Sequence, residues 1–292
     1  MPPTEPRLSI VIPSHRRCDL LEACLQSVTH FAPTDAEIIV VDDGSRRGII
    51  SRTATAFPGV TVIRHNSPRG FCCAANTGIG AATGTIVELL NDDAEVTEAW
   101  ADAALKAFRD SHVVAVAPLV LIHGKNPPRI DSAGDHYDRG GFACKRHHGQ
   151  VLSSVRLVPG NIESVSASAG FYRRTALISA GMFSEEFGAY FDDVDLSQRL
   201  LKQGTIRFEP ASVVFHHVSS SYGTQPGRRL IEQQSRNEEW LFWRHARPAH
   251  LPRHATVLAG KALRRMEEGT LGPWLTGRLK AVLTAFQSSS PR

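Results

Sequence analysis

Short apolar segments that end in polar or acidic residues constrain the fold more than any other feature of the chain. They cover residues 8–13, 37–43, 60–65 and 84–93, and segments with helical spacing of apolar residues, such as 18–29, separate them. Strands that alternate with helices predict an α/β fold, with a doubly wound, mostly parallel sheet and helices on both faces.

The last of these segments ends in Asn91-Asp92-Asp93. Ligands of open α/β sheets bind at the carboxyl ends of the strands. Two adjacent carboxylates repel each other unless a cation shares them, so this position favours a hard divalent ion that carries phosphate. A turn that caps a helix beginning near Thr97 is an alternative, because Asn and Asp are ordinary capping residues. The segment alone does not decide between the two.

Composition is typical of a soluble globular protein. The 292 residues are 42% hydrophobic and 21% charged, and their number suits one large domain or a domain with an appendage. No apolar run approaches the ~18 residues of a membrane span, and 8–13 is too short for a secretory signal core. The five cysteines are odd in number and lack paired metal spacing, which favours reduced thiols and a cytoplasmic location.

Positive charge is concentrated at the C-terminal end. From residue 244 onward there are nine cations and two acids, so this part is +7 although the whole chain is +4. An anionic membrane surface fits such a tail better than a nucleic acid does, because no nucleic-acid-binding module accompanies it. Apolar residues at helical spacing over 274–286 predict an amphipathic basic helix on the inner face of the cell membrane. A helix packed on the rest of the protein is the alternative.

A dinucleotide-binding site is excluded at the first turn. The residues after the first predicted strand are Ser14-His-Arg-Arg-Cys18, and they contain none of the glycines that hold a pyrophosphate. Gly78, Gly80 and Gly84 have the wrong spacing and precede a strand instead of following one.

Five sequence blocks, in order between about residues 8 and 245, carry a resemblance to a known family. The chain resembles the inverting glycosyltransferase family 2, of the GT-A fold. Its later part resembles the rhamnosyltransferase-like and galactofuranosyltransferase-like branch. The blocks are Ser9-Ile-Val-Ile-Pro-Ser14, Val40-Val-Asp-Asp-Gly-Ser45, Asn66…Gly70-Phe71…Ala75-Asn76-Thr-Gly78, Leu90-Asn-Asp-Asp93, and a segment from Ser168 to Gly204 that contains Phe191-Asp-Asp-Val-Asp195.

The resemblance implies a GT-A catalytic domain over 1–220, with a nucleotide-sugar half at about 1–110 and an acceptor half at about 111–220. A helical C-terminal extension follows at 221–292. The implied reaction moves a sugar from a dTDP- or UDP-sugar to a hydroxyl of a glycan or lipid-linked glycan, with Mg²⁺ or Mn²⁺ as cofactor. A catalytically silent nucleotide-sugar-binding protein of the same fold is the alternative, supported by the amide at Asn91 and the unusual His15.

The resemblance also implies roles for particular residues. Asp93 and His216 would bind the metal ion, with His217 as the alternative histidine. Asp193 would be the catalytic base, and Asp192 would tune or position it, since a neighbouring carboxylate raises basicity. The residues implied to bind the nucleotide sugar are Pro13, Ser14, His15, Asp43, Gly70, Asn76, Asp92 and Arg236.

Structural alternatives accompany these assignments. If Asp43 contacts the nucleobase, Asp42 is a strand-end carboxylate whose hydrogen bonds are made within the protein. The acids at 192–195 would cap a helix, and Asp195 is assigned that structural role. Arg236 would pair either with phosphate or with Glu232 on its own helix face.

The segment 122–154, rich in Gly, Pro and charge, predicts a flexible flap over the acceptor side. Cys144, His147 and His148 lie within it. No fourth metal ligand is near them in the sequence, so they are interpreted as part of a polar loop.

Overall fold

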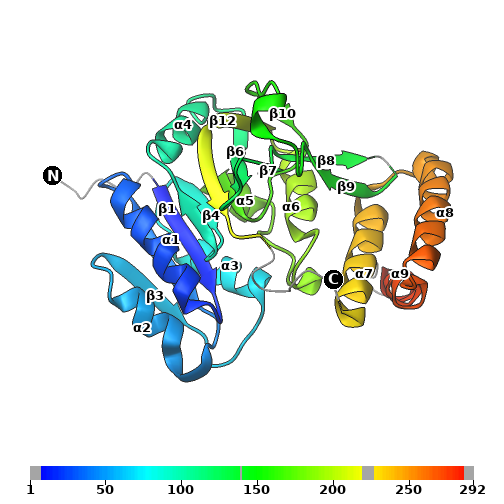
Figure 1. Ribbon diagram of the computed structural model, residues 1–292, viewed down its shortest axis with the longest axis horizontal. Coiled ribbons are helices and arrows are strands. Elements are labelled where there is room, and N and C mark those ends of the chain that lie inside the picture. The colour runs from blue at the N-terminus through cyan, green and yellow to red at the C-terminus, as the bar shows by residue number, and fades with distance from the viewer. Residues whose placement is uncertain (1–7, 139, 219–226, 286–292) are drawn as a thin grey trace.

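The computed structural model describes residues 8–138, 140–218 and 227–285. Its centre is one twisted sheet with helices on both faces, and a group of C-terminal helices lies at one end (Figure 1). The main path of the sheet has the order β10-β12-β6-β11-β4-β1-β2-β3. The predicted α/β class, with a mostly parallel sheet and a C-terminal helical extension, is confirmed.

The N-terminal half of the sheet is parallel because each strand is followed by a helix that crosses over it. On β1, Ile10 and Ile12 pack with α1, α2 and α4, while Val11 packs with α3 on the opposite face. Both faces are therefore buried, which explains the nearly continuous apolar runs. The elements are β1 (Leu8–Ser14), α1 (Cys18–Phe31), β2 (Glu37–Asp42), α2 (Ile49–Thr55), β3 (Val60–Arg64), α3 (Phe71–Ala81), β4 (Ile86–Leu90) and α4 (Trp100–Ala107).

One antiparallel strand, β11 (Ala169–Arg173), joins the two halves of the sheet. It pairs with β4 on one side and with β6 (Val113–Ile122) on the other. Next to β6 lies β12 (Thr205–His216), parallel to it. The remaining strands are β5 (Ala94–Val96), β7 (Ile130–Ser132), β8 (Asp135–Asp138), β9 (Phe142–Lys145) and β10 (Gly160–Ile162).

The structure decides one alternative left open by the sequence and corrects one expectation. Residues 94–96 form β5 and helix α4 begins at Trp100, so the alternative in which Asn91-Asp92-Asp93 cap a helix near Thr97 is wrong. The predicted flap at 122–154 contains three strands, and Ile130, Asp131 and Ser132 on β7 are almost completely buried. Isolated apolar residues in a Gly- and Pro-rich segment gave no periodicity from which such short strands could be identified.

Three helices make up the C-terminal group: α7 (Arg228–His245), α8 (Leu251–Glu267) and α9 (Leu271–Ala285). Helix α9 packs closely on α7, where a Cβ at Gly277 would lie 2.2 Å from the Glu232 carbonyl oxygen. Arg278 of α9 is buried and pairs with Glu238 and Glu239 of α7. The predicted helix over 274–286 thus packs on the protein as far as residue 285, and residue 286 lies outside the described residues. Among the described residues, no helix combines the length and apolar character that crossing a bilayer requires.

Shorter helices connect these elements. Helices α5 (Arg174–Ser179) and α6 (Asp192–Leu200) follow β11. Single 3₁₀ turns are η1 (Arg46–Gly48), η2 (Leu152–Ser154), η3 (Glu185–Phe187) and η4 (Pro248–His250).

Glu88 is a buried carboxyl group in the middle of β4. The Trp100 indole N–H donates to its Oε1 at 2.9 Å, and its Oε2 has no hydrogen-bond partner among the described residues. Burial raises the pKa of Glu88 to about 8. The folded protein therefore holds this proton more tightly than the unfolded chain does, and stability is lost as the pH rises from about 4.5 towards 8.

Glu88→Gln should remove that loss, because glutamine does not ionise. We expect the difference in unfolding free energy between the variant and the wild type to shift in the variant's favour by about 1–3 kcal/mol as the pH rises from roughly 5 to 9. Urea denaturation measures it. Glu98→Gln, at an exposed position, is the control and should follow the wild type. If the unfolding free energies of Glu88→Gln and the wild type changed in parallel with pH, this account of β4 would be contradicted.

Candidate active site

The carboxyl ends of β1 and β4 meet at one edge of the sheet. There the Ser14 hydroxyl, at the end of β1, donates to Asp92 Oδ2 at 2.6 Å. Removal from solvent raises the pKa of Asp92 to about 7, and the neighbouring Asp93 charge contributes in the same direction. Two residues that the sequence assigned to the nucleotide sugar are thus in contact.

Asp93 contacts His216, which is the last residue of β12. The distance from Asp93 Oδ1 to His216 Nε2 is 3.1 Å, and His216 Nδ1 lies 2.9 Å from Asp131 Oδ2 on β7. Burial lowers the pKa of His216, but its contacts with Asp131 and Asp93 outweigh burial and raise the value to about 9. The imidazole is therefore held between two carboxylates.

His217, the alternative histidine, faces another partner. Its Nε2 lies 2.7 Å from Glu95 Oε1, and its backbone N–H donates to the carbonyl oxygen of Asp93. Successive side chains of a strand point to opposite sides. His216 is consequently the histidine whose ring contacts the Asp93 carboxylate.

Asp131 is a site residue that sequence reasoning missed. It is fully buried, and the Lys145 ammonium lies 3.0 Å from both of its oxygens. Burial alone would raise the pKa of Asp131, but hydrogen bonds from His148 and His216 and the charge of Lys145 hold it well below its usual range. Lys145 and His148, the latter interpreted from sequence as part of a polar loop, therefore stabilise a buried anion.

Asp192 and Asp193 begin helix α6, as the sequence predicts. Tyr190 and Phe191 before them have positive φ of 69° and 64°, a strained conformation typical of functional sites. Asp193 Oδ2 accepts from the Ala167 amide and Oδ1 from the Val194 amide, both at 2.9 Å. These two backbone donors fix the orientation of the Asp193 carboxylate.

The two acids differ in their surroundings. Burial and the neighbouring Asp193 charge raise the pKa of Asp192 to about 8, and its Oδ2 has no partner among the described residues. Burial also raises the pKa of Asp193, against the two backbone hydrogen bonds. Asp195 pairs with Arg199 and His245 at 2.8 Å each, so it is an ion-pair residue and not the expected helix cap.

Lys145 interacts with both acidic groups, that of Asp93 and Asp131 and that of Asp192 and Asp193. The Lys145 ammonium contacts Asp131, and its charge lowers the pKa of Asp193. Asp135, also buried, lies near the same group: burial and then the Asp193 charge raise its pKa to about 7. Contacts thus lead from Asp93, after β4, through His216 and Asp131 to Lys145, whose charge acts on Asp193 a hundred residues further along the chain.

Asp43 shapes the loop between β3 and α3. Its carboxylate accepts from the backbone amides of Arg69 and Gly70 at 2.8 Å each, and His65 Nδ1 lies 2.8 Å away. Gly70 has φ 91°, a conformation that side chains rarely adopt. A carboxylate has about four acceptor positions, and these contacts use three of them.

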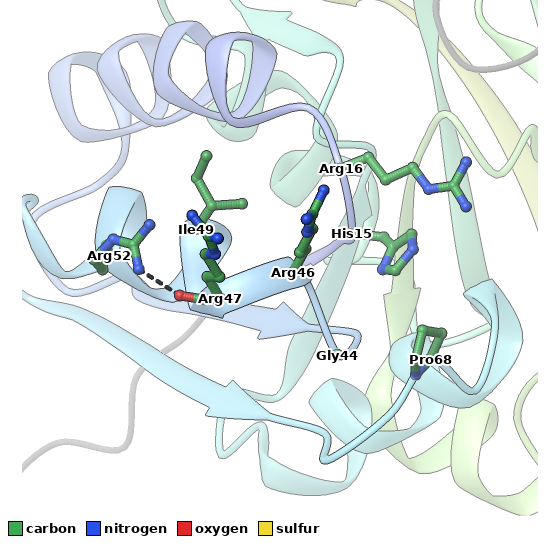
Figure 2. A pocket seen from close by; sticks show the side chains of 8 residues that line it. All are labelled: His15, Arg16, Gly44, Arg46, Arg47, Ile49, Arg52 and Pro68. Atoms are coloured by element: carbon green, nitrogen blue, oxygen red, sulfur yellow. Dashed lines mark hydrogen bonds between the residues drawn. The ribbon is translucent and has the colours of Figure 1, made fainter.

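A cavity of about 710 Å³ lies beside this loop (Figure 2). Its four arginines come from the β1–α1 loop, η1 and α2, and Arg52 donates to the Arg47 carbonyl oxygen. The lining contains no carboxylate among the described residues, so the cavity favours an anionic ligand. It is lined by His15, Arg16, Gly44, Arg46, Arg47, Ile49, Arg52 and Pro68.

Asn76 and Arg236 hold the segment 183–190, which leads to Asp192. Asn76 donates to the Phe183 carbonyl oxygen at 2.8 Å and accepts from its amide at 2.9 Å. Arg236 donates to the Glu186 carbonyl oxygen at 3.3 Å and lies over the Trp240 ring at 4.4 Å. Their contact with a nucleotide sugar stays a prediction.

The architecture, a twisted sheet whose strand ends carry carboxylates, is that of the GT-A fold. The chain belongs to glycosyl transferase family 2, whose profile matches residues 9–179. Among curated proteins, a pre-mycofactocin glycosyltransferase of Mycobacterium tuberculosis is 30% identical over 74% of this chain, which spans 44% of that relative's length. An N-acetylglucosaminyl-diphospho-decaprenol L-rhamnosyltransferase of the same species is 26% identical, over 84% of this chain and 87% of that protein.

Solved structures confirm the fold. GalNAc-T7 with UDP, GalNAc and Mn²⁺ superposes with a TM-score of 0.63 and 17% identity, over 81% of this chain and 48% of that one. The mannosyltransferase PcManGT of Pyrobaculum calidifontis, in complex with GDP-Man and Mn²⁺, superposes with a TM-score of 0.59 and 17% identity, over 99% of this chain and 89% of that one. At these identities the likeness extends to the fold alone.

Proposed function

We propose that the protein is an inverting glycosyltransferase that moves a sugar from a nucleoside diphosphate to a hydroxyl of a glycan or lipid-linked glycan. The proposal rests on the contacts of His216 with Asp93 and Asp131, and on Lys145, which contacts Asp131 and whose charge acts on Asp193. Family membership and the sugar-transferring relatives support it. In this assignment, residues 1–220 form the catalytic domain and 221–292 an extension.

The donor set at Asp93 and His216 fits a divalent ion. A carboxylate oxygen and an imidazole nitrogen already face each other, and Asp131 fixes the imidazole from its other side, as outer-shell carboxylates do at metal sites. Asp93 and His216 would therefore hold Mn²⁺ or Mg²⁺. When bound, the ion would neutralise charge on the departing diphosphate.

The donor would bind along the loops after β1, β2 and β3. Pro13, Ser14, His15 and Asp43 would contact the nucleoside, Asp92 and Gly70 would lie next to it, and the arginine-lined cavity would attract the anionic donor. Asn76 and Arg236 would keep the segment before α6 in place beside the sugar. We propose a UDP- or dTDP-linked donor, in keeping with the UDP of one structural neighbour and the rhamnosyl group in a relative's name.

Asp193 would be the general base. The acceptor hydroxyl oxygen attacks the anomeric carbon from the face opposite the diphosphate, the bond to the diphosphate breaks, and the hydroxyl proton passes to Asp193. Backbone N–H donors favour the ionised form of Asp193, whereas Asp192 lacks them at Oδ2 and keeps the proton at neutral pH. The pair is thereby divided into one neutral and one basic carboxyl group.

Asp193→Asn should abolish turnover, because an amide does not accept the proton. We expect release of nucleoside diphosphate to fall about 10²–10⁴-fold, measured with Mn²⁺, a lipid-linked acceptor and a panel of UDP-, dTDP- and GDP-sugars. Donor affinity, measured by calorimetry, should stay within about threefold, since the carboxylate does not contact the nucleotide. Asp35→Asn, at an exposed position, is the matched control.

Retained turnover in Asp193→Asn would refute the base assignment. Donor binding by the wild type without any turnover would instead favour the silent binding protein.

Asp131→Asn tests the support of the metal site. Because asparagine places a neutral amide opposite His216 Nδ1, the imidazole loses the anionic partner that fixes its orientation. We expect Mn²⁺ affinity, measured by electron paramagnetic resonance titration, to fall about 10–100-fold. Asp138→Asn, on neighbouring β8 and paired with Arg253, should leave the affinity unchanged, and an equal loss in both variants would overturn the account.

We further propose that the extension rests on an anionic membrane, where a lipid-linked acceptor would be found. Its helices α8 and α9 expose large apolar side chains among basic ones. These residues are Leu263, Met266, Leu275, Leu279 and Leu283, with Arg264, Arg265 and Lys280. Exposed apolar area together with positive charge is the character of an interfacial helix.

Leu279→Asp combined with Leu283→Asp should weaken this binding. We expect the wild type to float with anionic liposomes and the double variant to remain at the bottom of the gradient, because two carboxylates replace the inserted leucines. Ile178→Asp on α5, 44% exposed in the wild type, is the control and should still float. A wild type that does not float would remove the proposal.

A further inference from the structure

A second group of metal-ligating side chains lies beside the proposed site. Glu95, His123 and His217 each offer one ligand atom, and these atoms lie within 4.8 Å of one another. Glu95 Oε1 is 2.7 Å from His217 Nε2 and 3.5 Å from His123 Nε2. The two imidazole rings stack with their centroids 3.8 Å apart.

Backbone pairing fixes all three residues relative to one another. Glu95 is opposite Phe215 in the ladder between β5 and β12. The His217 amide donates to the Asp93 carbonyl oxygen, and the His123 amide donates to the His216 carbonyl oxygen, each at 2.9 Å. Glu95 is the middle residue of β5, and His123 and His217 directly follow β6 and β12. All three side chains thus project from paired backbone, which limits the backbone reorganisation that a shared ligand would require.

This group is separate from the carboxylate cluster. The side chain of His216 contacts Asp93 and Asp131, whereas the side chain of the next residue, His217, contacts Glu95. The two sets share no side chain. They also differ chemically, since two imidazoles and one carboxylate form a softer donor set than a carboxylate cluster that would share its ion with a diphosphate.

We propose that Glu95, His123 and His217 form a second metal site, which takes a transition-metal ion of the Zn²⁺ type. Two histidines and one glutamate are a known ligand set for zinc with a fourth, open position. The side chains are 31%, 41% and 25% exposed respectively, so water has access to that position. Because an imidazole binds a metal in its ring plane, the stacked rings must turn apart when the ion enters.

Cobalt binding to the full chain tests the proposal, since Co²⁺ replaces Zn²⁺ and has visible d–d absorption in such sites. Asp93→Asn disables the first site. If this variant binds one Co²⁺ per chain and Zn²⁺ displaces it, the ion occupies the second metal site. Adding His123→Ala should lower the Co²⁺ affinity about tenfold or more, as even outer-shell changes do at metal sites. Glu95→Gln, which keeps the shape of the side chain, should have the same effect.

His136→Ala removes an exposed histidine that pairs with Glu163 outside the group, and should leave Co²⁺ binding intact. The titrations are repeated on chains with native Asp93 in excess Mg²⁺, so the result does not depend on the Asp93→Asn variant. Absence of Co²⁺ binding, or binding that His123→Ala and Glu95→Gln leave unchanged, would overturn the second site and leave Glu95 as a polar partner of His217 and His123. Neither result bears on sugar transfer, which the Asp193→Asn experiment tests independently.

Discussion

The contact of His216 with two carboxylates is the interaction on which the rest of the site depends. Asp93 and Asp131 lie on opposite sides of the imidazole, at 3.1 and 2.9 Å, and Asp131 is fully buried. A buried carboxylate without partners would be costly, so Lys145 and His148 must accompany it. Positive side chains from a segment of irregular sequence therefore make it possible for acids from several strands to lie together.

The topology explains how residues far apart in the chain reach this region. Antiparallel β11 pairs with β4 and β6 and so fixes the N-terminal parallel half, which ends in Asp93, against the half that ends in His216. The loop just before β11 supplies the Ala167 amide that orients Asp193. In the same way Asn237 of α7 donates to three carbonyl oxygens within 187–190, which fixes the segment preceding α6. Sheet and extension thus both position the proposed base.

Much of this arrangement could be predicted from sequence, and the reasons for the rest are physical. The parallel strands and α6 were identified because their apolar periodicity is strong and their ends carry acids. The segment 122–154 was misinterpreted because β7, β8 and β9 have three or four residues each, too few for a period. Asp131 and Asp135 were missed for the same reason, since nothing in the local sequence distinguishes a buried acid from an exposed one. The positions of Asn76 and Arg236, which hold backbone, depend on tertiary contacts that no local pattern encodes.

The central claim is that the Asp93 and Asp193 groups share one site, and paramagnetic broadening by Mn²⁺ tests it most directly. In a ¹H–¹⁵N spectrum of the full chain, substoichiometric Mn²⁺ should broaden the amide signals of Ala167 and Val194 together with that of His217. The Trp274 indole signal on α9 should remain sharp, and Asp93→Asn should remove the broadening at Ala167 and Val194. Broadening confined to the neighbours of Asp93, with Ala167 and Val194 unaffected, would contradict the account.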